Sequence, residues 1–117
     1  MKFSEIIETL NARVVSEASD FNSCQVSSVV VSDLMSDVLV SDKPSPLILT
    51  SLSTDQAIRT ASMVDASGVV ITQNKPLPEG IDKLAEELDI TLLHTPMDKF
   101  KACVLLGKLL ERNEIEI

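Results

Sequence analysis

The stretch Ser28–Ser41, SVVVSDLMSDVLVS, changes its hydrophobic period half-way along. Its first part ends an extended segment, Gln25–Ser32, whose run of valines favours a strand. From Asp33 onward the apolar residues recur three and four positions apart, as on one face of a helix. The stretch therefore predicts a strand that runs directly into a helix, one unit of an alternating α/β fold.

The same unit recurs three times toward the C-terminus. Continuous apolar runs predict strands at Leu47–Leu49, Val69–Ile71 and Ile90–Leu93, because strands covered on both faces lack polar alternation. Helical patterns follow each run, and their expected starts are a capping box of Ser53 with Gln56, Pro78 in a first turn, and Thr95 as N-cap before Pro96. The last helix is expected over Met97–Arg112, and the helix after Ser53 is expected to end near Gly68.

Two further elements precede these units. Phe3, Ile6, Ile7 and Leu10 have helical spacing, and Ala12–Glu17 reads as an edge strand of either direction. The order of elements predicts one domain, residues 1–117, with a three-layer α/β/α sandwich and a mainly parallel sheet of four or five strands.

Composition excludes several classes of function. The net charge of -8, without a cluster of Lys or Arg, argues against nucleic-acid binding. No window is apolar enough to span a membrane, and Glu5 and Glu8 interrupt the place of a signal peptide, so a cytoplasmic protein is expected. Cys24 and Cys103 stand in no metal or redox motif and are expected to be unpaired thiols.

Small polar residues follow each predicted strand. In a parallel sheet the carboxyl ends of the strands share one edge, where ligands commonly bind. The expected ligand-binding residues are therefore Ser32, Asp33, Thr50, Ser51, Ser53, Thr72, Lys75, His94 and Thr95. Ser, Thr and Asp are also favoured at these places simply as helix caps, so a crevice and plain capping both remain open.

Catalytic motifs are missing from the chain. Its three glycines permit no Gly-rich phosphate loop, its single histidine stands in no triad signature, and no His or Cys cluster predicts a metal site. We therefore expect neither an enzyme nor a cofactor. An enzyme that uses His94 with Asp33 as acid and base stays open as a minor alternative.

Asp33 and Asp37 lie four residues apart and would share one face of a helix. Asp37 is expected to face water. For Asp33 two roles are open: it favours the helix N-terminus through the helix dipole, or it contacts a ligand or partner.

The last helix is apolar over much of its circumference. One stripe holds Phe100, Cys103, Val104, Gly107 and Leu110, and a second holds Ala102, Leu105, Leu106 and Leu109. One sheet does not easily cover both stripes, which predicts a homodimer through this helix.

The order of segments, in particular VSDLMSDVL, PLILTSLSTDQAI, SGVVITQN and ITLLHTPMDKF, resembles the DRTGG-domain family over nearly the whole chain. The family fold is similar to the N-terminal domain of HPr kinase/phosphorylase. Ser27 and Ser28 stand where the family has paired glycines, and the family arginine is missing.

The resemblance implies a regulatory or ligand-sensing module, often dimeric, and not an independent enzyme. We expect it to bind a small metabolite at the carboxyl edge of the sheet, with phosphate-bearing compounds as the leading class. A protein-interaction subunit of a larger metabolic or redox complex, of the hydrogenase type found with some relatives, is the alternative.

Overall fold

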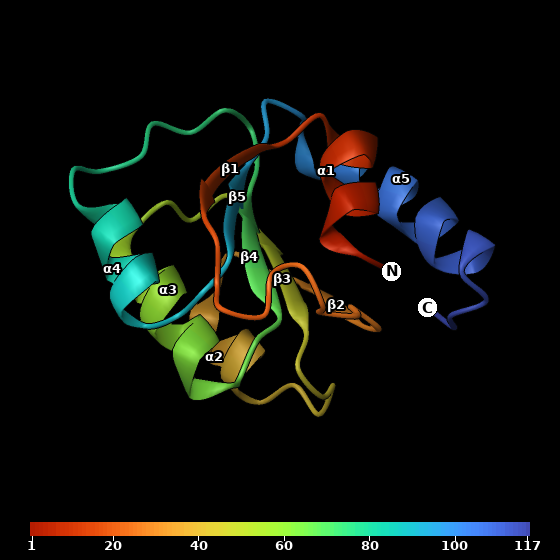
Figure 1. The fold of residues 1–117 in the computed structure, drawn as a ribbon, viewed down its shortest axis with the longest axis horizontal. Helices are drawn as coiled ribbons and strands as arrows, with labels where there is room; N and C mark the ends of the chain where they lie inside the picture. Colours follow the sequence, from red (N-terminus) through yellow and green to blue (C-terminus); the bar gives the residue numbers. More distant parts are fainter.

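The computed structural model describes all residues from 1 to 117 and shows a five-stranded sheet between two layers of helices (Figure 1). The helices are α1 (Phe3–Leu10), α2 (Met35–Leu39), α3 (Asp55–Met63), α4 (Ile81–Glu87) and α5 (Lys99–Arg112). The strands are β1 (Arg13–Ser16), β2 (Val29–Val31), β3 (Leu47–Thr50), β4 (Gly68–Ile71) and β5 (Leu92–His94). The predicted α/β class with a mostly parallel sheet is confirmed.

The strand order is β1-β5-β4-β3-β2. β2 to β5 are parallel and lie side by side in sequence order, so their carboxyl ends share one edge. β1 is antiparallel to β5 and places Arg13 opposite His94 at that same edge. The direction of the edge strand, open from sequence, is thereby resolved.

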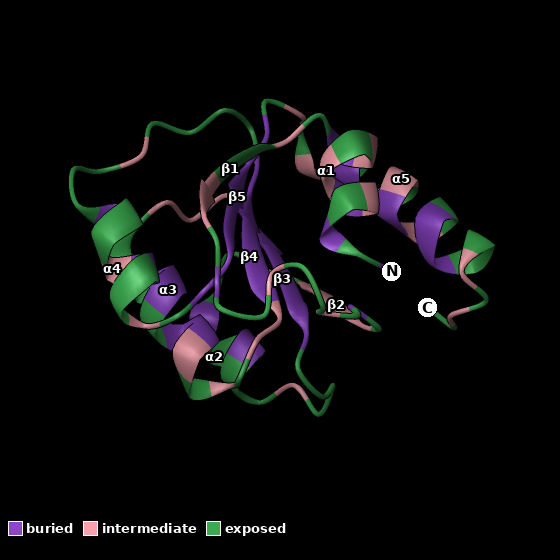
Figure 2. Cartoon of the chain, viewed as in Figure 1, coloured by how far each residue is buried: buried purple, intermediate pink, exposed green.

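The two helical layers follow from this order. α2, α3 and α4 each connect neighbouring parallel strands, and equally handed crossovers place all three on one face. α1 and α5 cover the other face (Figure 1). β3, β4 and β5 are buried on both faces, which explains their unbroken apolar sequences (Figure 2).

β2 is shorter than the predicted Gln25–Ser32. Val26 instead exchanges two hydrogen bonds with Met1: each main-chain nitrogen donates to the other residue's carbonyl at 2.8 Å. The main-chain groups of Val26 are therefore hydrogen-bonded to Met1 and are not available to extend β2.

Two expected helix starts are wrong because their side chains bond elsewhere. α2 begins at Met35 with Leu34 as N-cap, while the Asp33 carboxylate bonds to β3 and α5. α5 is capped by Asp98, whose Oδ1 accepts from the main-chain N–H of Lys101 at 2.8 Å. Thr95 lies earlier and bonds to α1.

The other two starts are shifted by a few residues. The N-cap of α3 is Thr54, and no capping-box hydrogen bond joins Ser53 to Gln56. α4 starts at Ile81 after Gly80, so Pro78 precedes its first turn. Gly68 does not end α3 but begins β4. None of the five helices has the length and apolarity that crossing a membrane requires.

Candidate functional site

The four strand ends lie on one edge, as predicted. Ser32 donates its main-chain N–H to Leu49 at 3.2 Å, Thr72 donates to Thr50 at 2.9 Å, and Thr95 donates to Ile71 at 2.9 Å. The sheet ladder thus continues through the polar tips. It ties the carboxyl edge together before any side chain is considered.

The three threonines of this edge are fully buried. Thr50 donates to the Asp33 carboxylate at 3.0 Å, Thr72 donates to the Thr50 carbonyl at 3.3 Å, and Thr95 donates to the Leu10 carbonyl at 2.6 Å. Every hydroxyl is satisfied within the protein. In this conformation the expected donors Thr50, Thr72 and Thr95 brace the edge and do not face solvent.

Asp33 joins three elements. Its carboxylate accepts from the Thr50 hydroxyl at 3.0 Å, and from both the main-chain N–H and the hydroxyl of Ser51 at 2.7 Å each. The ammonium of Lys99, at the start of α5, completes the set and forms the one salt bridge of the chain. Through these bonds Asp33 fastens α5 to the edge of the sheet.

These contacts shift the titration of Asp33. Partial burial alone would raise the pKa of its carboxyl, but the Lys99 ammonium and the hydrogen bonds from Ser51 and Thr50 outweigh it. The net result is a pKa well below the ordinary carboxyl range. The carboxylate therefore stays ionised at neutral and mildly acidic pH.

His94 is buried, and both of its ring nitrogens are bonded. Nδ1 lies 3.1 Å from Nη2 of Arg13, and Nε2 lies 2.7 Å from the Lys75 carbonyl. A guanidinium only donates, so Nδ1 accepts and Nε2–H donates, which selects the neutral Nε2–H tautomer. His94 thus holds Arg13 in place from a buried position.

His94 and Asp33 do not form the acid and base pair left open from sequence. β3 and β4 separate their strands, a distance of about 14 Å at the usual strand spacing. Their contacts also differ, since Asp33 bonds to α5 while His94 bonds to β1 and the loop before α4.

The remaining expected residues have separate roles. The Ser32 hydroxyl closes a local turn with Leu34, accepting from its N–H at 3.0 Å. Ser53 is half-buried before the start of α3, and Lys75 is exposed. The Ser51 hydroxyl donates its hydrogen bond to the Asp33 carboxylate. None of the predicted residues lines the pocket that lies beside this edge.

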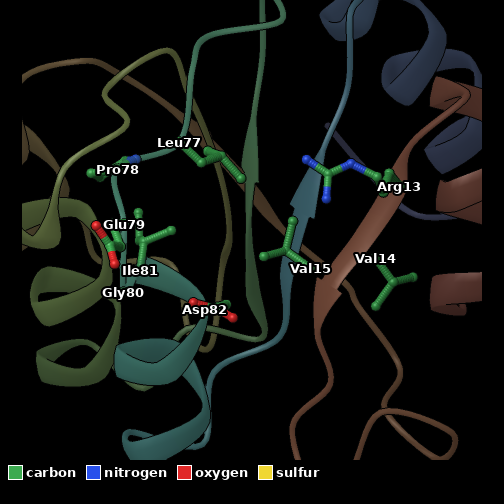
Figure 3. Close-up of a pocket in the computed structure, with 9 residues that line it drawn as sticks. All are labelled: Arg13, Val14, Val15, Leu77, Pro78, Glu79, Gly80, Ile81 and Asp82. Atoms are coloured by element: carbon green, nitrogen blue, oxygen red, sulfur yellow. The ribbon is translucent and has the colours of Figure 1, made fainter.

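A pocket of about 400 Å³ opens beside this edge, between β1 and the start of α4 (Figure 3). It is lined by Arg13, Val14, Val15, Leu77, Pro78, Glu79, Gly80, Ile81 and Asp82, and we call it the Arg13 pocket. The side chains of Val15 and Leu77 supply apolar surface, and Arg13 is the one cation of the lining. Glu79 and Asp82 supply carboxylates on the α4 side and form no salt bridge.

Sequence reasoning missed this pocket. Arg13 reaches the carboxyl edge only because β1 is antiparallel, and that direction was open. The turn PLPEG, residues 76–80, was the available signal, since a segment rich in Pro and Gly before a helix often shapes a binding loop.

The structure contains no metal-binding cluster and no disulfide. No group of three or more His, Cys, Asp or Glu side chains is placed to hold a metal ion. Cys24 and Cys103 are free and half-buried, and burial raises the pKa of each thiol.

A family comparison agrees with this fold. The DRTGG domain family matches residues 5–109. This chain belongs to the DRTGG-domain family. No curated protein matches the sequence.

One solved structure is similar in fold: the CBS and DRTGG domains of the regulatory region of Clostridium perfringens pyrophosphatase, complexed with its activator, diadenosine tetraphosphate. The TM-score is 0.70 at 20% sequence identity, over 90% of the present DRTGG chain. The match covers 45% of that solved chain, so the present chain spans less than half of its length.

Proposed function

We propose that this DRTGG domain is a non-enzymatic regulatory module that binds a small phosphate-bearing metabolite in the Arg13 pocket. The observation that carries the proposal is the Arg13 guanidinium, held by His94 beside a pocket of about 400 Å³ at the carboxyl edge. Ligand pockets commonly have this size and position. A planar guanidinium suits a phosphate group because it donates two parallel hydrogen bonds.

The rest of the pocket favours a nucleotide over inorganic phosphate. Val15 and Leu77 offer apolar surface for a base, while Glu79 and Asp82 can accept hydrogen bonds from ribose hydroxyls. Lys75 lies in the loop that leads into the pocket, and its exposed ammonium is a second candidate phosphate contact. The nucleotide activator of the Clostridium pyrophosphatase supports the same class of ligand.

Two contacts support a module without catalysis. Both nitrogens of His94 are occupied, and the Asp33 carboxylate is neutralised by Lys99. Acid and base catalysis needs a titratable group within reach of a substrate proton. Neither side chain meets that requirement at the Arg13 pocket.

Thermal unfolding with a nucleotide panel tests the proposal. Diadenosine tetraphosphate, AMP, ADP, ATP and inorganic phosphate are compared, and a ligand at 100 times its Kd is expected to stabilise the protein by about 2.7 kcal/mol. Arg13→Ala is expected to weaken that ligand at least tenfold, because the guanidinium contact is lost.

Arg59→Ala is the matched control, since Arg59 is exposed on α3 and makes no salt bridge. It is expected to leave the Kd unchanged. A nucleotide that binds wild-type and Arg13→Ala proteins with equal affinity would place the site elsewhere.

A second candidate function is protein interaction, beginning with a homodimer through α5. Ala102, Leu106, Leu109 and Leu110 are buried against the sheet and α1, whereas Phe100 is 79% and Val104 40% exposed. A helix with a covered face and a second, exposed apolar face is typical of a subunit contact. The same face would suit docking to a larger metabolic or redox complex.

Light scattering coupled to size exclusion tests the homodimer. The wild-type protein is expected to have twice its 12.7 kDa chain mass at micromolar concentration, and Phe100→Glu is expected to be monomeric because it buries a charge at the contact. Met63→Glu is the control, since Met63 is 71% exposed on α3. A wild-type mass of one chain at every concentration contradicts the homodimer.

A further inference from the structure

β2 is an edge strand, and no other strand pairs with its outer side. On its inner side Ser28 accepts from Leu47 at 2.8 Å and Ser32 donates to Leu49 at 3.2 Å. Backbone groups alternate in direction along a strand, so those of Val29 and Val31 point away from the sheet. Such an edge is a template for another strand.

One side chain shields this edge. Lys43 donates its ammonium to the Val29 carbonyl at 3.0 Å. Both residues are otherwise free to change partners, because Lys43 is exposed and lies in the loop before β3. Lysine at an edge strand is a common device against uncontrolled pairing.

The exposed stripe of α5 lies on the same side of the molecule. Val29 and Val31 share an apolar groove with Cys103, Leu106 and Gly107 of α5, closed at one end by Ile117. Phe100 and Val104 continue the stripe outward, and Val31 itself is 44% exposed. The unpaired strand and the uncovered helix therefore form one continuous surface.

We infer that two copies of this chain join through β2, in antiparallel register with the two-fold axis at Val30, to form one sheet of ten strands. Val29 of each copy then pairs with Val31 of the other, and the four outward backbone groups of each strand are all satisfied. The inference rests on the proposed α5 homodimer and specifies its geometry. A continuous sheet places both copies of α5 side by side on one face, where Phe100 and Val104 cover each other.

A second copy suits this surface better than an unrelated partner. A short antiparallel strand is complementary to itself under a two-fold axis, so one sequence satisfies both sides. Val31, Phe100 and Val104 are exposed apolar side chains, and the strand edge and polar rim extend this surface toward the roughly 800 Å² per partner of a stable dimer. The chain has a net charge of -8, but α5 has no acidic residue between Lys99 and Leu110. Two copies that meet through this part of α5 therefore do not bring carboxylates of the helix together.

Val30→Cys tests the register, in a Cys24→Ala and Cys103→Ala background. Val30 would face its own copy across a non-hydrogen-bonded pair, with Cα atoms about 4.5 Å apart, which permits a disulfide. Mild oxidation is expected to cross-link most of the protein as a dimer. Val14→Cys on β1, the opposite edge strand, is the matched control and is expected to stay uncross-linked.

Removal of Lys43 tests the shielding. Lys43→Ala is expected to tighten the dimer several-fold, because the Val29 carbonyl then has no competing donor.

Light scattering distinguishes failure of the β2 pairing from failure of the α5 homodimer. A dimer in which Val30→Cys does not cross-link overturns pairing through β2 and leaves the α5 contact standing. A monomer at all concentrations overturns both the α5 homodimer and the pairing through β2. The same holds if the protein stays monomeric while an added extended peptide binds to the edge of β2.

Discussion

Asp33→Asn is expected to lower the free energy of unfolding by about 2 kcal/mol at pH 7. The substitution removes the charge that pairs with Lys99 and places an amide N–H₂ where Ser51, Thr50 or Lys99 now donates. Hydrogen bonds to a charged group are individually stronger than those between neutral groups. The expected loss is nevertheless moderate, because the Asp33 side chain is 42% exposed and solvent screens its charge. Denaturant unfolding of both proteins measures the difference.

The difference is also expected to depend on pH. The folded state lowers the pKa of Asp33 below its ordinary value of 3.8, so the contribution is fully present above that value. It declines as pH falls below 3.8 toward the folded pKa, because the unfolded chain then takes up the proton first. Wild-type and Asp33→Asn stabilities should therefore converge in acid.

Asp37→Asn is the control for Asp33. Asp37 is exposed, and its side chain makes no hydrogen bond or salt bridge, so its replacement is expected to change stability by less than about 0.5 kcal/mol. Equal small effects of both substitutions would contradict the role of Asp33 as the fastening between α5 and the sheet edge.

Gly68→Ala is expected to destabilise the protein by about 2 kcal/mol. A Cβ at Gly68 would lie 3.0 Å from the Phe3 ring and 3.1 Å from the Thr91 carbonyl oxygen. Phe3 is buried and stacks on Phe21 with ring centroids 5.4 Å apart, and the Thr91 oxygen belongs to the backbone beside β4. Neither neighbour can move without disturbing the α1 layer or the β4–β5 ladder.

Gly107→Ala is the matched control, because a Cβ there meets only Ile117 at 3.6 Å. Alanine favours a helix over glycine, so this variant is expected to gain up to about 1 kcal/mol. Both glycine variants are compared by thermal unfolding at one protein concentration. A stable Gly68→Ala protein would mean that α1 packs less closely on β4 than the structure has it.

The sheet could be predicted because its central strands are buried on both faces. Unbroken apolar runs such as Leu47–Leu49 and Val69–Ile71, each followed by polar residues, are typical of such strands and too short for buried helices. The short strand β1 could be placed at an edge but not oriented. Four residues give too weak a pattern to choose a direction, and that choice depends on pairing with β5.

Helix starts were predicted less well, for a physical reason. Ser, Thr and Asp bond equally well to a helix N-terminus or to a neighbouring strand, and sequence does not distinguish the two. Thr95 bonds to α1 and Asp33 to α5, so each helix begins later than expected.

The same ambiguity affected the candidate site. The polar residues of the strand ends were brought to one edge as predicted, but most of them bond to one another. The open pocket depends on Arg13, whose place is fixed by His94 from another strand. Such a pairing, 81 positions apart along the chain, leaves no local signal.

Nucleotide binding in the Arg13 pocket can be located residue by residue with amide chemical-shift mapping. A uniformly ¹⁵N-labelled protein is titrated with AMP and with diadenosine tetraphosphate. Saturable shifts are expected to concentrate at Arg13–Val15 and Leu77–Asp82, on both sides of the pocket. Saturable shifts confined to other parts of the surface, or no shifts at millimolar nucleotide, would contradict it.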